Sequence, residues 1–302
     1  MKTIYLHIGI GKTGTSSIQD MLVRNYDLFL KQDVLVPKSG IKYGMAHHGL
    51  ANLAEEDFSL ETKENYEDLI KEIDESNAKT VIISSELFSY VKPRYIEQIH
   101  QYLNKYDVKI VFYVREQVKL FESGYLQNLK AGSEKLQKNN MGGVIYDFRQ
   151  FCSDLNKKDF NLLIQPWHDM FGYKNIICKL YDKKLNNGDI CSHFLKVIKL
   201  EKVAIEYPNK QSNESLIPDF IKLVEMIDKL NPNSDKRISL INKLILLSNR
   251  FRPLAKNHIL DDSEFYKNLR NSFYESNDLF ASKYLTQEEK EILLNYHKED
   301  NL

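Results

Sequence analysis

A glycine-rich loop between an apolar segment and a helical pattern constrains the fold more than any other feature of this sequence. The loop spans residues 9–17 and reads GIGKTGTSS. Residues 4–8 before it have the apolar character of a buried strand in a parallel sheet. Residues 17–29 after it carry apolar side chains at helical spacing. The sequence therefore predicts a strand, a tight loop and a helix at its start.

The alternation of strand and helix continues along the first two thirds of the chain. Besides 4–8, the candidate strands are 80–85, 108–114 and 175–180. The helical stretches that precede them are 64–73, 96–103 and 147–155. This alternation is typical of an α/β fold with a central parallel sheet.

The last third of the chain has a helical pattern only. Apolar side chains recur at helical spacing from 216 to 227 and again from 240 to 245, and no Pro/Gly/Ser-rich linker precedes them. We therefore expect one domain over 1–302, with an α/β core at 1–210 and a helical extension at 211–302 packed on it.

Composition limits the partners and the location of the chain. The 42 Lys and Arg residues balance 42 Asp and Glu residues, so no overall field draws the protein to nucleic acid, and an anion site must be local. The three cysteines lack the spacing of a metal or disulfide framework, which predicts buried thiols in a reducing compartment. No apolar run is long enough for a transmembrane segment or a signal peptide, which predicts a cytoplasmic protein.

The chemistry of the loop suits a phosphate-like anion. A turn between a strand and a helix presents backbone N–H groups and the positive end of the helix dipole, and Lys12 adds a full charge. The candidate anion-binding residues are Gly11, Lys12, Thr13, Gly14, Thr15, Ser16 and Ser17. An ordinary turn with solvated polar residues is the alternative. The ATP-binding P-loop pattern requires glycine at position 6, where this chain has Leu6.

The order of residues in the loop matches a different family. The segment KTGTSS at 12–17, preceded by a strand that ends in His7, Ile8 and Gly9, closely resembles the 5′-phosphosulfate loop of sulfotransferases that use 3′-phosphoadenosine 5′-phosphosulfate (PAPS). The resemblance implies a three-layer, P-loop nucleoside triphosphate hydrolase-like fold, PAPS as the donor and no metal. It also implies that Lys12 stabilises the charge that develops on the leaving oxygen.

A second motif of that family binds the 3′-phosphate of the donor. There a strand ends in an arginine, and a serine follows eight positions later on the next helix. The corresponding residues here are Arg115, after the strand at 108–114, and Ser123. Arginine provides a planar charged fork that suits phosphate. The family often has Asp-Pro or Asn-Pro after the arginine, whereas this chain has Glu116 and Gln117.

A third segment, with Asn213 and Ser215, resembles the Asn-x-Ser-Leu sequence that opens the C-terminal helices of bacterial carbohydrate sulfotransferase-like proteins. The resemblance makes both residues candidate contacts to the donor nucleotide. Each would equally serve as the N-cap of a helix.

Transfer to a hydroxyl requires a general base. In sulfotransferases this base commonly follows the strand before the arginine strand, which corresponds to Glu86 here. The carboxyl end of a parallel sheet is also where such folds bind ligands. The alternative is the pair His47 and His48, on a loop between glycines, whose imidazoles have suitable pKa values and would line the acceptor site.

These features predict a PAPS-dependent sulfotransferase acting on a saccharide, a glycolipid or another hydroxyl acceptor. Two alternatives stay open from the sequence. One is a small-molecule kinase that uses ATP and magnesium on the same fold, with Lys12 on ATP and Glu86 near the metal. The other is a non-catalytic nucleotide-binding partner protein.

Overall fold

A computed structural model describes residues 1–138, 147–206, 215–230 and 234–297. These residues form two compact units. The first unit contains the described residues within 1–115, 159–209 and 273–298, and the second contains those within 116–158 and 210–272. The organisation of the whole chain as one domain stays a prediction.

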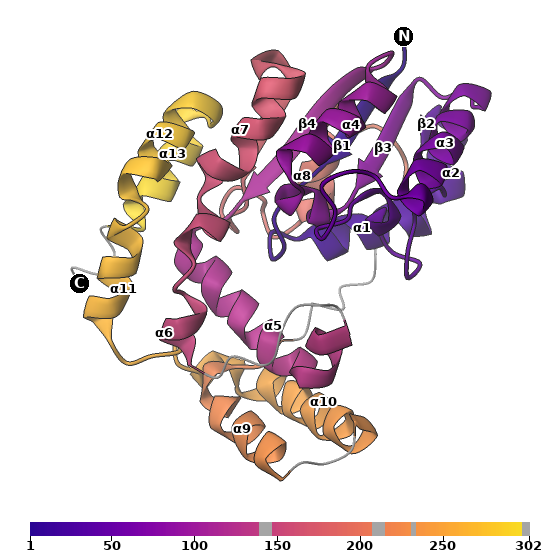
Figure 1. Ribbon diagram of the computed structural model, residues 1–302. Helices are drawn as coiled ribbons and strands as arrows, with labels where there is room; N and C mark the ends of the chain where they lie inside the picture. The colour runs from indigo at the N-terminus through magenta and orange to yellow at the C-terminus, as the bar shows by residue number, and fades with distance from the viewer. Residues whose placement is uncertain (139–146, 207–214, 231–233, 298–302) are drawn as a thin grey trace. The chain divides into compact units, whose positions relative to one another are not determined.

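A parallel sheet of five strands lies at the centre of the first unit, in the order β2-β3-β1-β4-β5 (Figure 1). The strands are β1 (Thr3–His7), β2 (Val34–Leu35), β3 (Thr80–Ser84), β4 (Asp107–Val114) and β5 (Ile176–Leu180). Leu6 of β1 pairs with Ile83 of β3 on one side and Ile110 of β4 on the other. The carboxyl ends of these three adjacent strands therefore meet at one edge of the sheet.

Helices cover both faces of this sheet, with α1 and α8 on one and α4, α7 and α12 on the other (Figure 1). The helices of the first unit are α1 (Thr15–Arg24), α2 (Tyr26–Leu30), α3 (Leu60–Glu75), α4 (Pro93–Leu103), α7 (Phe160–Phe171), α8 (Ile190–Val197), α12 (Tyr274–Tyr284) and α13 (Gln287–Asn295). The short 3₁₀ helices are η1 (His48–Leu50), η2 (Glu86–Tyr90) and η4 (Tyr173–Asn175). The predicted three-layer α/β fold class is confirmed.

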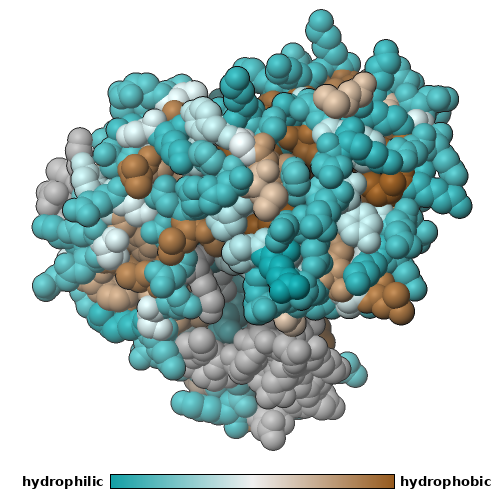
Figure 2. Space-filling model, turned by 45° about the horizontal axis from the view of Figure 1, so that its top comes forward, coloured by the Kyte–Doolittle hydropathy of each residue, from teal (hydrophilic) through white to brown (hydrophobic). Residues whose placement is uncertain are grey.

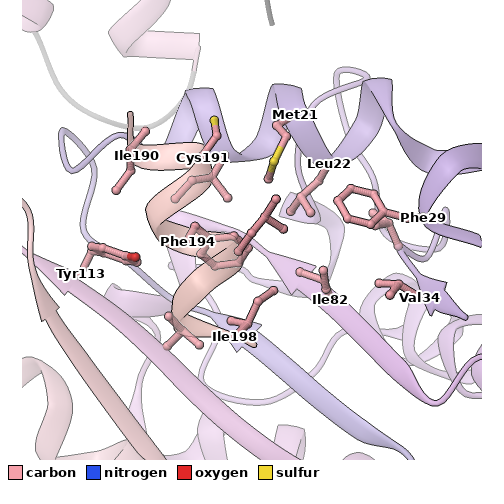
Figure 3. Packing of buried hydrophobic residues seen from close by; sticks show 14 residues of the cluster. Met21, Leu22, Phe29, Val34, Ile82, Tyr113, Ile190, Cys191, Phe194 and Ile198 are labelled. Carbon is pink, nitrogen blue, oxygen red and sulfur yellow. The ribbon is translucent and has the colours of Figure 1, made fainter. Parts of the chain in front are cut away.

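A buried apolar cluster fixes α1 against the sheet (Figure 3). Met21 and Leu22 of α1 and Phe194 of α8 lie in one cluster with Ile82 of β3 and Tyr113 of β4. Complete burial of such a side chain stabilises a fold by about 1.5–3 kcal/mol. Because α1 starts directly after the glycine loop, this packing also holds the loop in place.

The helix predicted over 17–29 is divided at Asn25, which separates α1 from α2. The side chain of Asn25 donates to Met21 O at 2.8 Å and to Glu206 O at 2.8 Å, and it accepts from Glu206 N at 2.6 Å. The two bonds to Glu206 tie this division to a distant segment, and the backbone bonds from Asn25 N to Met21 O at 3.2 Å and from Phe29 N to Asn25 O at 2.8 Å persist across it. The helix predicted over 147–155 was also wrong in extent: only Phe148–Phe151 form an α-helix there, and α7 is the helix that precedes β5.

The described part of the second unit is helical. It contains α5 (Gln117–Lys138), α6 (Phe148–Phe151), α9 (Ile221–Lys229), α10 (Ser234–Phe251) and α11 (Ser263–Asn271), with 3₁₀ helices η3 (Leu155–Lys158), η5 (Pro218–Phe220) and η6 (Arg252–Leu254). Glu116 accepts from Val118 N at 3.0 Å and Lys119 N at 2.9 Å, and it pairs with Arg270 at 3.3 Å. Glu116, the first of the two residues that replace the Asp-Pro or Asn-Pro pair, thus caps α5.

The face of the described residues seen in Figure 2 is mostly hydrophilic, with hydrophobic areas scattered among the hydrophilic ones. Among the described residues, no helix is long and apolar enough to cross a membrane. All three cysteines, Cys152, Cys178 and Cys191, are buried and unpaired, as predicted.

Candidate active site

The glycine loop has two residues in the left-handed backbone region. Lys12 has φ = 76° and Gly14 has φ = 82°. Gly14 is the N-cap of α1, and a Cβ atom there would lie 2.9 Å from Ile190, so the position requires glycine. For a lysine this conformation costs about 1–3 kcal/mol, a strain that functional sites commonly hold. The first turn of α1 carries no acidic residue, which leaves its positive dipole end suited to an anion.

The hydroxyl groups of the loop have different surroundings. Thr13 is buried, and its hydroxyl donates to Ile10 O at 2.6 Å, which closes the loop on itself. Thr15 is buried as well, whereas Ser16 and Ser17 are half-buried at the start of α1. Ser16 and Ser17 are therefore the hydroxyls placed to reach a bound anion.

A buried histidine lies directly beneath this loop. His7 ends β1, and its Nδ1 is 2.8 Å from the hydroxyl of Ser84, the last residue of β3. A Cβ atom on Gly9 would lie only 2.7 Å from His7 Nε2. Burial lowers the pKa of His7 to about 3, so the ring is neutral. The neutral ring of His7 thus packs against the loop at Gly9.

Gly9→Ala is expected to destabilise the protein by about 1–3 kcal/mol, because the new methyl group overpacks against the imidazole of His7. Gly11→Ala is the matched control, because a Cβ atom there meets nothing within 4 Å. Thermal or denaturant unfolding of both variants measures the difference. Equal stabilities would show that His7 does not support the loop.

Arg115 follows β4 and contacts the loop. Its Nη1 donates to Lys12 O at 3.1 Å, and its guanidinium lies 5.6 Å from the ring centroid of Tyr181. The predicted partner Ser123 lies on α5 in the second unit, so the pairing of Arg115 with Ser123 stays a prediction. Arg115 and the loop are brought together within the first unit.

Glu86 begins η2, with one residue between it and the strand end at Ser84, and is half-buried. Its Oε2 accepts a hydrogen bond of 2.7 Å from Gln19 Nε2 on α1, and its Oε1 lies 4.0 Å from His48 Nε2. Gln19 therefore connects the candidate base to the helix that starts at the glycine loop. His48 is the second titratable group at the same carboxylate.

The two predicted histidines have distinct environments. His48 is half-buried, and its Nδ1 lies 2.8 Å from Ser85 Oγ. Burial lowers the pKa of His48, and the charge of Glu86 opposes this shift. His47 is buried, its Nδ1 accepts from Ser84 N at 3.1 Å, and its Nε2 donates to Pro37 O at 2.9 Å. Of the pair, His48 is the one placed to meet a substrate.

The buried His47 makes stability depend on pH. Burial lowers the pKa of His47 to about 4, whereas the unfolded chain takes up this proton near pH 6.5. The unfolded state therefore binds more protons between these values. The resulting loss of stability starts as pH falls below about 6.5 and reaches the order of 3 kcal/mol by pH 4. His7 contributes in the same direction.

We expect His47→Gln to make the fall of unfolding free energy between pH 7 and pH 5 shallower than in the wild type, because glutamine does not titrate there. Denaturant unfolding at several pH values measures this slope. The slope is informative even if the variant is less stable at every pH. Parallel curves for the two proteins would contradict a neutral, buried His47.

Of the third sequence motif, the segment with Asn213 and Ser215, the structure describes only the last part. Asn213 lies outside the described residues. Ser215 belongs to the second unit, where its carbonyl oxygen accepts from Arg252 Nη2 at 2.7 Å and its hydroxyl lies 3.3 Å from Arg252 Nη1. Among the described residues, no group of three or more His, Cys, Asp or Glu side chains is arranged to hold a metal ion.

Three residues of this site were not predicted from the sequence: Gln19, His7 and Tyr181. Gln19 had a detectable signal, because positions 15, 18, 19 and 22 lie on one buried helical face and a glutamine there needs a polar partner. For His7 the sequence predicts only a place in a strand, and nothing local shows that its ring turns toward the loop.

No protein-family profile matches the chain. A protein of Archaeoglobus fulgidus, described as uncharacterised, is 24% identical over 215 residues, which cover 70% of this chain and 56% of that protein. The chain therefore spans little more than half the length of this relative. The crystal structure of a sulfotransferase from Alicyclobacillus acidocaldarius is similar with a TM-score of 0.40 and 16% identity, over 79% of this chain and 95% of that chain.

Proposed function

We propose that this protein transfers a sulfuryl group from PAPS to the hydroxyl of a saccharide, a glycolipid or a similar acceptor, at a cytoplasmic location. One observation carries the proposal. The glycine loop, Arg115 and Glu86 follow three adjacent parallel strands, and hydrogen bonds connect Arg115 to the loop and Glu86 to α1. Parallel sheets bind their ligands at this carboxyl edge.

The donor half of the site has the chemistry of an anion cradle. Left-handed residues such as Lys12 and Gly14 before a helix start are typical of loops whose backbone N–H groups bind an anion, and Lys12 adds a positive charge. These groups would hold the 5′-phosphosulfate. Arg115 would hold the 3′-phosphate together with Ser123, and Asn213 and Ser215 are proposed nucleotide contacts.

The acceptor half of the site would activate the hydroxyl. Glu86 would take the proton as the acceptor oxygen forms its bond to sulfur, and Gln19 would keep the carboxylate oriented through its bond to Oε2. The S–O bond to the 5′-phosphate breaks in the same step, and Lys12 would stabilise the negative charge on the departing oxygen. His48, 4.0 Å from Glu86, is the alternative base.

Ligand binding tests the choice of donor. We expect calorimetry without magnesium to show tighter binding of adenosine 3′,5′-bisphosphate than of ATP. Arg115→Ala should weaken the binding of the bisphosphate by about 10–100-fold, as expected for the loss of a hydrogen-bonded charged contact. The affinity for adenosine 5′-monophosphate should stay nearly unchanged. Preference for magnesium-ATP would favour the kinase instead. Bisphosphate binding without transfer to any acceptor would favour a non-catalytic nucleotide-binding protein.

A further inference from the structure

The segment of the second unit from α9 to η6 exposes both apolar and basic side chains. Seventeen large apolar side chains are exposed in the part of the chain that the structure describes, and eight of them lie between residues 221 and 254. They are Leu223, Met226, Leu230, Ile238, Leu246, Leu247, Phe251 and Leu254. The same stretch has seven Lys and Arg residues against three Asp and Glu residues, although the whole chain is neutral.

On α10, the basic residues form a stripe. Lys236, Lys243 and Arg250 are exposed and follow one another at seven-residue intervals, which places them on one side of the helix. This side is opposite the buried Ile241 and Ile245. The exposed Leu246 and Leu247 are the helical neighbours of Lys243 and Arg250.

On α9, the apolar residues form a stripe. Leu223, Met226 and the C-cap residue Leu230 are spaced by three and four residues, so they share one side of the helix, away from the buried Val224. Lys222 and Lys229 are exposed beside them. We call the exposed side chains of 222–254 on α9, α10 and η6 the α9–α10 surface.

We propose that the α9–α10 surface docks on an anionic lipid bilayer. Helices of this kind lie in the membrane interface, where apolar side chains enter the boundary between headgroups and acyl chains. Lysine and arginine bind the anionic headgroups and can extend past their apolar neighbours to reach them. The inference does not rest on the proposed function.

Other occupants fit this surface less well. A symmetric dimer through the same surface would bring its basic stripe against an identical stripe, which is repulsive. Nucleic acid would use the basic residues, yet exposed aliphatic side chains give it no contact to phosphate. Protein interfaces are depleted in lysine at their centre, whereas here lysines alternate with the apolar residues.

Vesicle flotation tests the basic stripe. The full-length protein is expected to float with vesicles of phosphatidylglycerol and phosphatidylcholine at low salt, and not with phosphatidylcholine alone. Each basic residue near an anionic surface contributes a factor of about five to partitioning. The triple variant Lys236→Glu, Lys243→Glu, Arg250→Glu should therefore lose at least about 100-fold. The control triple Lys31→Glu, Lys63→Glu, Lys71→Glu makes the same change in net charge on exposed positions of the first unit and should keep floating.

A second pair of variants tests the apolar contribution. Leu230 and Leu246 are 79% and 63% exposed, and the control residues Leu60 and Leu279 are 74% and 63% exposed. Leu230→Gln with Leu246→Gln should weaken flotation by at least about tenfold, since it removes two side chains that enter the bilayer. Leu60→Gln with Leu279→Gln should leave flotation unchanged. Circular dichroism should show both variants folded, because all four side chains are exposed.

Several results would overturn the proposal. They are failure of the wild type to float with phosphatidylglycerol, equal losses in the control variants, or flotation that survives the substitutions at Leu230 and Leu246. Concentration-dependent self-association without flotation, abolished by those same two substitutions, would identify a second copy of the chain as the occupant. Binding of an acidic protein or of RNA without vesicle binding would likewise reject the bilayer.

Discussion

Lys12→Ala is expected to retain the fold and to lower the rate of sulfuryl transfer by about 10²–10³-fold. A donor that stabilises a developing oxyanion commonly lowers the activation free energy by about 2.7–4 kcal/mol. Lys12 is only half-buried, and alanine is smaller than lysine, so the substitution overpacks no part of the core. The measurement is transfer from labelled PAPS in a panel of saccharide and lipid acceptors, with products read by mass.

The control for this variant is Lys31→Ala, which removes a charge from an exposed position of the first unit, away from the loop in sequence. It should transfer at the wild-type rate. Thermal unfolding of both variants separates loss of chemistry from loss of fold. Near-normal transfer by a folded Lys12→Ala protein would remove Lys12 from the proposed mechanism.

Glu86→Gln is expected to lower transfer by about 10²–10⁴, the usual contribution of a general base. Glutamine has nearly the same shape and keeps an oxygen that can accept the hydrogen bond from Gln19, so the geometry around α1 should persist. The variant should therefore bind adenosine 3′,5′-bisphosphate as tightly as the wild type. Calorimetry and the transfer assay together check both expectations.

His48→Asn is the discriminating companion to Glu86→Gln. Its imidazole lies 4.0 Å from Glu86 and is the second candidate base at this position. If Glu86 is the base, His48→Asn should retain most of the transfer rate. If instead His48→Asn is inactive and Glu86→Gln transfers normally, the base is His48 and the role given to Glu86 is wrong.

The local parts of the fold were predictable because each has a signal within a few residues. The strand, loop and helix at the start of the chain are one continuous pattern, and the predicted strands at 80–85, 108–114 and 175–180 match β3, β4 and β5 to within about one residue. The two-residue β2 was missed, since so short a strand has no alternation to detect. Pro166 inside α7 similarly weakens a helical pattern that the structure nonetheless contains.

The contacts that organise the candidate site were less predictable because they join distant positions. Gln19 and Glu86 are 67 residues apart, and only the packing of α1 beside β3 brings them together. The resemblance of the loop indicated which residues could bind the donor, but not that Arg115 would bond to the carbonyl of Lys12. Similarly, the sequence did not indicate that His47 would be held by backbone groups while its neighbour lies beside Glu86.

The last segment of the chain completes the first unit, and this affects the order in which the protein can fold during synthesis. Glu289 of α13 accepts from Leu180 N of β5 at 3.1 Å, and Phe280 of α12 packs against Phe112 of β4. A ribosome makes β5 long before it makes these helices. Until α12 and α13 are made, the apolar side chains of β4 and β5 that these helices cover stay exposed. Such exposure favours chaperone binding or aggregation. A fragment that ends near residue 210 would remain in that state permanently.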